Sequence, residues 1–228
     1  MDTALADRLA AVDDRIRDAA RAAGREVSGI TRIVVTKFHP AALVQDLYAL
    51  GVRHVGENRQ QELTAKRAEL VGIPDLTWHF IGQAQTNKAR LVRAGADAVH
   101  SVDRARIADA LHNAAPGDDV LDVLVQVNLT DDPGRGGVAP EEVGALATHV
   151  AALDSLRLRG VMAVAPLDEQ PARAFERLRR CADAVRAVVP DADWISAGMT
   201  GDFPEAIAMG ATHLRIGSAI TGPRPPRD

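Results

Sequence analysis

Short β-rich runs alternate with longer helical runs along almost the whole chain of 228 residues, and this alternation constrains the fold more than any other feature. The expected strands are residues 33–36, 54–56, 78–81, 98–101, 123–128, 160–164, 194–196 and 214–216. The expected helices between them are residues 41–50, 58–70, 86–94, 104–114, 140–152, 170–188 and 203–209. Several of the strands are apolar throughout, which is typical of parallel strands that are covered on both faces. Eight strands that alternate with helices predict an α/β fold, a single (β/α)8 barrel of the TIM type.

An additional helix is expected before the first strand. Apolar residues recur there at steps of four and three, which is the pattern of an amphipathic helix; they are Leu5, Leu9, Val12, Ile16 and Ala19. The alternative fold is a doubly wound open sheet, which also alternates strands with helices. It usually holds fewer strands, and no Gly-x-Gly-x-x-Gly turn follows the first strand of this chain.

The chain shows no linker that would divide it, so we expect one domain over residues 1–228. The Gly- and Pro-rich residues 131–137 are the best candidate for a linker, but they follow a strand and precede a helix, which indicates a long βα loop. The Pro- and Arg-rich residues 222–228 are expected to be a frayed end.

Charge and cysteine content exclude several classes of protein. A net charge of −4 gives no basic surface for nucleic acid or for a membrane. The chain has a single Cys, Cys181, which excludes an intramolecular disulfide framework and fits a reducing cytoplasm. The seven His residues lack metal-ligand spacing, and no Gly-x-Ser-x-Gly motif supports a hydrolase, so neither a metal nor that activity is expected.

Polar residues and glycines follow the last strands of the predicted barrel. In such barrels the active face is the carboxyl end of the strands, and the last two loops frequently hold a phosphate group. Here those loops read Ser196-Ala-Gly-Met-Thr200 and Arg215-Ile-Gly-Ser218. Gly198 and Gly217 could each be ordinary turn glycines, but the two loops together favour a phosphate site.

Lys37 is the most informative single residue. It ends an apolar strand, and only three of the 27 basic residues are Lys, namely Lys37, Lys66 and Lys88. Unlike Arg, Lys can lose its proton and form a Schiff base with an aldehyde. A lysine that merely extends to solvent at the strand end is the alternative. Together with a phosphate site across the barrel mouth, Lys37 favours pyridoxal 5′-phosphate (PLP) as the ligand.

The other candidates receive structural interpretations. Lys66 lies in a charged helical stretch and is expected in solvent, while Lys88 opens a helix and is expected to be structural. His79 alternates within its strand, which favours the core or the barrel interior over catalysis.

The chain also resembles the family of pyridoxal phosphate homeostasis proteins, which share the alanine racemase N-terminal-type barrel (PLP fold type III). The resemblance runs over nearly the whole chain. The segments that carry it are residues 35–40, 56–58, 61–62, 78–82, 85–88, 100–103, 125–128, 158–162, 196–200 and 215–222.

Site residues follow from this resemblance position by position. It implies that Lys37 carries PLP as an internal aldimine, that Asn58 and Met162 lie near the ring, and that Arg215 faces the pyridine nitrogen. The residues that resemble the phosphate cradle are Ser196, Met199, Thr200, Gly217 and Ser218.

Two functions remain open from the sequence. One is a PLP carrier of intracellular PLP homeostasis, without amino-acid turnover; the other is a PLP-dependent racemase or decarboxylase. Racemisation needs a base on each face of the substrate, and in related racemases a Tyr from a second domain supplies one of them. The single Tyr here, Tyr48, falls in the first helix after Lys37. We therefore expect a non-catalytic cytoplasmic monomer, with PLP-dependent apo-enzymes as candidate partners.

Overall fold

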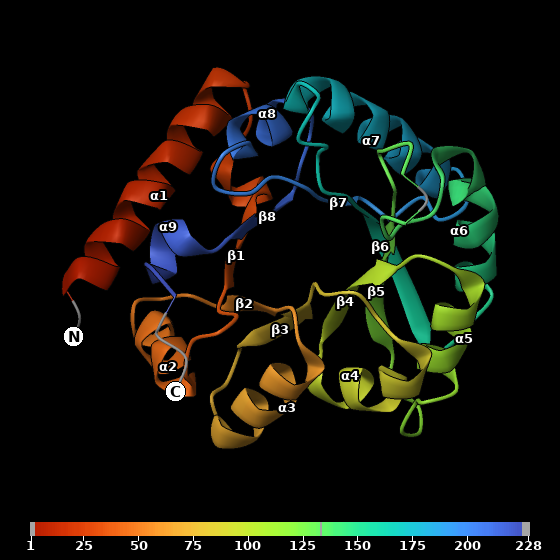
Figure 1. Cartoon of the computed structure of the whole chain (residues 1–228), viewed down its shortest axis with the longest axis horizontal. Coiled ribbons are helices and arrows are strands. Elements are labelled where there is room, and N and C mark those ends of the chain that lie inside the picture. Colours follow the sequence, from red (N-terminus) through yellow and green to blue (C-terminus); the bar gives the residue numbers. More distant parts are fainter. Residues whose placement is uncertain (1–2, 133, 225–228) are drawn as a thin grey trace.

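Eight parallel strands close into a barrel in the computed structural model, which describes residues 3–132 and 134–224. The strands pair in sequence order, and β8 closes the ring by pairing with β1 (Figure 1). They are β1 (Thr31–Val35), β2 (His54–Glu57), β3 (Thr77–Phe80), β4 (Ala98–Val102), β5 (Leu121–Gln126), β6 (Leu156–Met162), β7 (Trp194–Ser196) and β8 (His213–Ile216). The predicted (β/α)8 barrel is confirmed, and the doubly wound open sheet is excluded.

Helices surround the barrel between successive strands (Figure 1). The α-helices after β1 are α2 (Ala41–Ala49), α3 (Gln60–Glu69), α4 (Ala89–Gly95), α5 (Ala105–His112), α6 (Val143–Ala151), α7 (Pro171–Arg186), α8 (Phe203–Ala208) and α9 (Ser218–Thr221). Three 3-10 turns accompany them, at Val27–Gly29, Thr86–Lys88 and Pro140–Glu142. No helix in the described part of the chain has the length and apolar character needed to cross a membrane.

The expected additional helix is α1 (Thr3–Ala22), which packs outside the barrel against α8 and α9 (Figure 1). Its inner face buries Leu5, Leu9, Val12, Ile16 and Ala20. The spacing of four and three residues is what places these side chains on one stripe. Because α8 and α9 come from the end of the chain, α1 joins the beginning of the sequence to its end.

Some element boundaries differ from the predicted ones. Strand β6 begins at Leu156, four residues before the expected start, because Leu156-Arg-Leu-Arg159 alternates between buried and more exposed positions instead of being apolar throughout. The helix expected over 86–94 begins with the turn Thr86–Lys88, and α9 was not anticipated. Of the expected frayed end, residues 225–228 lie outside the described part of the chain.

The barrel interior and the layer between strands and helices have different character. Apolar side chains fill the layer beneath the helices. Inside the barrel, polar side chains from β3, β4, β7 and β8 are buried and bond one another: His79, His100, Ser196 and Arg215. His79 therefore lies in the barrel interior, as its alternation within the strand predicts.

Candidate functional site

Lys37 emerges at the carboxyl end of β1. Thr36 is fully buried, whereas the next residue, Lys37, is exposed. Phe38 follows with a φ of 69°, an uncommon left-handed conformation for a bulky residue. The Lys37 Nζ lies 5.8 Å from the centre of the Phe38 ring. The chain thus turns sharply where the lysine leaves the strand.

A buried ion pair holds the strand just before Lys37. Lys66 on α3 donates to the carbonyl oxygen of Thr36 at 2.8 Å and to Glu57 Oε1 at 2.6 Å. The Thr36 hydroxyl also donates to Glu57 Oε1, at 2.6 Å. Lys66 is only 5% exposed, so its expected position in solvent was wrong. Helix periodicity shows a charged face, but it does not show that this face turns toward a carboxylate at the end of β2.

The backbone of Phe38, the residue after Lys37, is also fixed by a hydrogen bond. Glu62 Oε2 accepts a hydrogen bond from the backbone N–H of Phe38 at 2.6 Å and lies 3.7 Å from Lys66 Nζ. Burial raises the pKa of Glu57, and the contacts with Lys66 and Thr36 oppose that rise. One ammonium and two carboxylates therefore fix the backbone on both sides of Lys37. Sequence reasoning did not identify this group.

Arg215 lies in the middle of the barrel, on β8. Its guanidinium donates to Ser196 Oγ at 2.8 Å and to the carbonyl oxygen of Ala163 at 2.9 Å. Burial lowers its pKa to about 10, so the side chain stays charged at neutral pH. A fixed buried cation here attracts the polar or anionic part of a ligand in the mouth.

The loops after β7 and β8 bring backbone close to that cation. Gly198 has a φ of +90°, and a Cβ there would lie 2.7 Å from the Cβ of Ala206, so only glycine fits. The backbone N–H of Met199 donates to Asp202 Oδ1 at 2.6 Å. Thr200 follows in the same loop, which thus turns over the barrel end with Met199 partly exposed.

Gly217 and Ser218 lie beside the strand that carries Lys37. Strand β8 pairs with β1 through Val34 and Ile216, and an added Cβ on Gly217 would lie 3.7 Å from the Cβ of Val35. The structure therefore brings Lys37 and the predicted phosphate loop together, although about 180 residues separate them in the sequence. The two segments lie close together because β8 pairs with β1 when the barrel closes.

Asn58 and Met162, the remaining site residues expected from the sequence, lie at the carboxyl ends of β2 and β6. Met162 is buried, and Asn58 Oδ1 is buried without a hydrogen-bond partner. A Cβ on Gly82 would lie 1.9 Å from the carbonyl oxygen of Asn58, so Gly82 permits the two chain segments to touch. An unpaired buried oxygen at the barrel mouth fits a polar ligand, because native proteins seldom leave such an atom without a partner.

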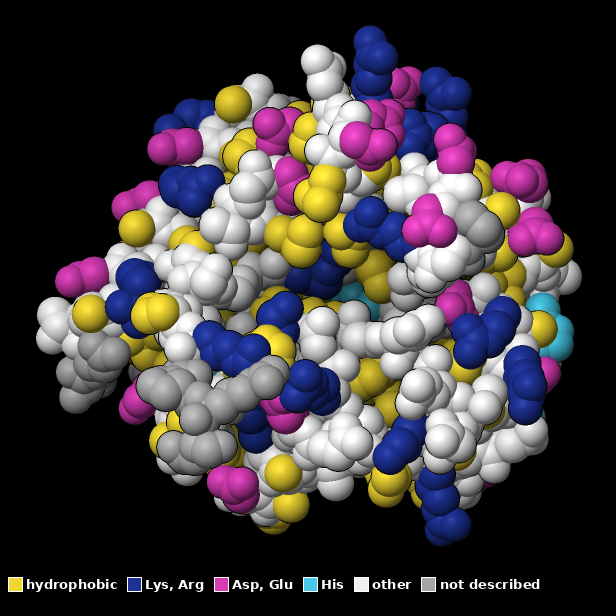
Figure 2. All heavy atoms as spheres, in the orientation of Figure 1, with side chains coloured by type: hydrophobic (Ala, Val, Ile, Leu, Met, Phe, Trp, Pro, Cys, Tyr) yellow, Lys and Arg dark blue, Asp and Glu magenta, His cyan; other side chains and the backbone are white. Residues whose placement is uncertain are grey.

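Positive side chains gather around the hollow at the centre of this face (Figure 2). The guanidinium groups of Arg59 and Arg224 lie 5.0 and 3.8 Å from the centre of the Phe38 ring, which Lys37 also approaches. Lys37, Arg59 and Arg224 thus lie around one ring just after β1, and Arg215 is a further cation buried inside the barrel. The mouth is therefore suited to an anion.

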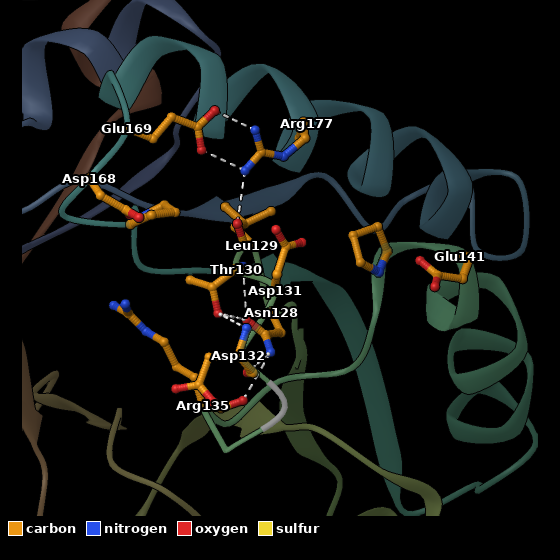
Figure 3. Close-up of a pocket in the computed structure, with 12 residues that line it drawn as sticks. Asn128, Leu129, Thr130, Asp131, Asp132, Arg135, Glu141, Asp168, Glu169 and Arg177 are labelled. Atoms are coloured by element: carbon orange, nitrogen blue, oxygen red, sulfur yellow. Dashed lines mark hydrogen bonds and ion pairs between the residues drawn. The ribbon is translucent and has the colours of Figure 1, made fainter.

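A second hollow, of about 770 Å³, lies between the loops that follow β5 and β6 (Figure 3). Arg177 forms an ion pair with Glu169 in this hollow, and its other contact is the Leu129 carbonyl oxygen at 2.8 Å. Asn128 accepts from the Thr130 backbone N–H and hydroxyl. Four further carboxylates line the hollow, with one further cation, Arg135, and two prolines; the carboxylates are those of Asp131, Asp132, Glu141 and Asp168. This hollow is poorly suited to a phosphate, in contrast to the barrel mouth.

Comparisons with known proteins find relatives over nearly the whole chain. A profile of the family described as "Alanine racemase, N-terminal domain" matches residues 8–225. The pyridoxal phosphate homeostasis protein of Pseudomonas aeruginosa is 43% identical over 224 residues, which cover 96% of each chain. The protein of the same name from Escherichia coli K12 is 40% identical over 226 residues, which cover 96% of this chain and 97% of that protein.

Solved structures show the same likeness. PipY of Synechococcus elongatus with PLP bound superposes with a TM-score of 0.83 at 35% identity, covering 96% of this chain and all of PipY. Alanine racemase from Corynebacterium glutamicum superposes with a TM-score of 0.71 at 16% identity, covering 96% of this chain and 62% of the racemase. At that identity the racemase shows a shared barrel fold.

Proposed function

The chain belongs to the alanine racemase N-terminal domain family and, within it, to the pyridoxal phosphate homeostasis proteins, and on this premise we propose that it binds PLP at the barrel mouth and serves PLP homeostasis without turning over amino acids. The observation that carries the proposal is the juxtaposition of Lys37 with the Gly217–Ser218 loop, in a mouth that also holds Arg215. The proposed binding unit is the single domain of residues 1–228.

The residues present fit this cofactor. PLP supplies an aldehyde that combines reversibly with a primary amine, and a phosphate group that needs hydrogen-bond donors. The Lys37 amine would hold the aldehyde end. Backbone N–H groups of Thr200, Gly217 and Ser218 and the hydroxyls of Thr200 and Ser218 would hold the phosphate, beside Met199, whose own N–H bonds to Asp202. The unpaired Asn58 Oδ1 would accept a hydrogen bond from the ligand, and Met162 would pack against it.

Arg215 favours holding the cofactor over using it for catalysis. A guanidinium donates hydrogen bonds and does not accept a proton, so it stabilises a neutral pyridine nitrogen. A neutral ring withdraws electrons less strongly than a protonated one, which disfavours chemistry at the amino-acid α-carbon. Since related racemases also use Arg there, this point supports the proposal without deciding it.

The position of Tyr48 also favours a non-catalytic role. Tyr48 is the only Tyr in the sequence, and it lies on α2. Its ring packs under the guanidinium of Arg53, which precedes β2 at the amino end of the barrel. The phenol is thus at the end opposite Lys37. It does not provide the second base that racemisation requires.

The proposed partners are PLP itself and PLP-dependent apo-enzymes that accept it, and the proposed location is the cytoplasm, with the chain acting as a monomer. Exposure of Lys37 at the open mouth supports reversible loading and release. A metal is not part of the proposal. Among the described residues, no group of three or more His, Cys, Asp or Glu is placed to hold one.

Absorbance spectroscopy tests the binding site. Purified protein incubated with PLP and then desalted should keep a visible absorption band that Lys37→Ala abolishes. Lys88→Ala is the matched control, because Lys88 lies in the turn before α4 and should leave the band unchanged. A band that persists in Lys37→Ala would overturn the proposed site.

Turnover and transfer assays test the role. PLP-loaded protein should activate a PLP-dependent apo-enzyme and should leave a panel of L- and D-amino acids unchanged. Racemisation or decarboxylation that is lost in Lys37→Ala would overturn the non-catalytic role and favour the enzyme alternative.

A further inference from the structure

Three histidines form a continuous hydrogen-bonded chain through the inside of the barrel. His54 Nδ1 lies 3.0 Å from His79 Nε2, and His79 Nδ1 lies 2.9 Å from His100 Nε2. The three residues come from the neighbouring strands β2, β3 and β4. His79 and His100 are fully buried, whereas His54 is partly exposed and lines a surface hollow with Arg32 and Arg53. Water therefore reaches one end of the chain.

The other end of the chain meets the proposed PLP site. His100 Nδ1 lies 2.9 Å from Ser196 Oγ, and the same oxygen accepts a hydrogen bond from Arg215 at 2.8 Å. Arg215 has donors only, so the direction of that last bond is settled. Ser196 can then either donate its own proton to His100, or accept a second bond from His100 and donate its proton elsewhere.

The buried rings are neutral. Burial lowers the pKa of His79 and of His100 well below the ordinary value, and the neighbouring histidines lower both further. A neutral imidazole donates through one nitrogen and accepts through the other. In an unbroken chain all the bonds must therefore run the same way, either from Ser196 toward His54 or from His54 toward Ser196.

Protonation of His54 removes this choice. A protonated imidazole carries a proton on both nitrogens, so His54 Nδ1 must donate to His79 Nε2. His79 then donates to His100, and His100 donates to Ser196. In this direction Ser196 receives bonds from His100 and Arg215, and its hydroxyl proton is free for a ligand at the mouth.

We propose that His54, His79 and His100 are positioning residues that couple the protonation of His54, at the amino end of the barrel, to the direction of the Ser196 hydroxyl beside Arg215. The coupling deepens the proposed function and rests on it, because the ligand that benefits is PLP at the mouth. The hydroxyl becomes a donor to that ligand when His54 is protonated. Binding of PLP and binding of a proton to His54 therefore assist each other.

The proton balance of the switch is simple. The proton on His79 Nε2 moves to His54 Nδ1, the one on His100 Nε2 moves to His79 Nδ1, and the Ser196 proton moves to His100 Nδ1. Ser196 regains a proton from hydronium in the water at the mouth, so the added proton enters there and the positive charge comes to rest on His54. His79 and His100 end neutral, His54 ends with both nitrogens protonated, and the net change is the uptake of one proton.

Other charged groups determine the pH at which His54 takes up its proton and which ring carries the added charge. The pKa of His54 is lowered by burial and by the nearby Arg32. Arg215 disfavours a positive charge on His100, which keeps the added charge at the His54 end. The charged and titratable groups around the chain are Asp13 and Arg17 of α1, Arg32, Arg53, His213 and Arg215.

Nitrogen NMR of the histidine side chains tests the coupling directly. Ligand-free protein at pH 8 should show His79 and His100 both protonated on Nε2, and acidification through the titration of His54 should move both protons to Nδ1 together. Adding PLP at pH 7 should produce the same change. Two rings that keep their tautomers through both treatments would overturn the proposal.

Affinity measurements over pH 5.5–8.5 provide the second test. One coupled proton makes PLP affinity rise by up to about tenfold per pH unit on acidification through the titration of His54. His54→Asn keeps a hydrogen-bonding atom near the Nδ1 position but does not titrate, so its affinity should depend less steeply on pH. His112→Asn is the control, because His112 lies on α5 and contacts Ser155.

The outcomes separate the two proposals. Equal pH dependence in wild-type protein and His54→Asn overturns the coupling while PLP binding stands. A wild-type protein that does not bind PLP overturns the proposed function, and the tautomer change on acidification of ligand-free protein through the titration of His54 still decides the coupling.

Discussion

Replacing Lys66 with Met should destabilise the protein strongly, because it leaves a carboxylate buried without its cation. Lys66 and Glu57 are 5% and 0% exposed, and their charged atoms lie 2.6 Å apart. Removing one partner of a buried pair costs about 3–5 kcal/mol. In Lys66→Met the hydroxyl of Thr36 remains as a donor to Glu57 Oε1. We therefore expect a loss near 4 kcal/mol in the free energy of unfolding at pH 7.

Urea unfolding followed by circular dichroism measures this loss. With a slope of about 2 kcal/mol/M, the midpoint should fall by about 2 M. The double variant Glu57→Gln/Lys66→Met is the control, since it removes both charges, and it should recover more than half of the loss. Such a recovery shows that the uncompensated charge, rather than lost packing, causes the effect.

The pH dependence of Lys66→Met gives a sharper check. Without the ammonium, the pKa of Glu57 rises further in the folded protein, so the folded state binds more protons than the unfolded state above about pH 4.5. The stability of the variant relative to wild type should then be greater at pH 5 and should fall as the pH rises. A loss below 1 kcal/mol that is equal at pH 5 and pH 8 would refute the buried ion pair.

Three further results are expected. The wild-type protein should lose stability below about pH 6.5, by about 1.4 kcal/mol per pH unit for each buried His, because the unfolded chain takes up protons that His79, His100 and His213 resist when folded; urea midpoints that stay level from pH 7 to pH 5 would contradict this. Gly82→Ala should cost about 3 kcal/mol and weaken PLP binding through Asn58, whereas Gly144→Ala, with open space around it, should be neutral in the same unfolding and binding titrations. Arg177→Met, in the second hollow, should leave PLP affinity within twofold by absorbance titration, and a larger loss would assign that hollow a part in binding.

Much of the architecture follows from patterns that need no tertiary information. Short apolar runs locate most of the strands, because parallel strands in a barrel are covered on both faces, and period-3.6 patterns locate the helices. The predicted start or end of an element is less accurate where only one face of it is buried, as at the amino end of β6, where arginines alternate with buried leucines. Short terminal pieces such as α9 carry too few residues for any periodicity.

The candidate site also contains some residues that the sequence predicts and others that it does not. Lys37 and the glycine loops can be predicted because their chemistry is unusual for their positions. The buried position of Lys66 cannot be predicted in this way. Its ammonium donates to the carbonyl oxygen of Thr36, thirty residues earlier in the sequence, and no local sequence pattern indicates a contact at that distance along the chain. The hydrogen-bonded chain of histidines cannot be predicted from the sequence for a related reason. Residues 54, 79 and 100 share one hydrogen-bond line only after the barrel has closed.

The pairing of β8 with β1 has a consequence for how the protein matures during synthesis. Lys37 is made about 180 residues before the loop at Gly217 and Ser218 and the buried Arg215. A nascent chain that lacks β8 has the reactive amine without the groups that would surround a ligand, and α1 has no α8 or α9 to cover. Cofactor capture is thereby delayed until β8 has been made, so a chain that holds PLP is one whose barrel has closed.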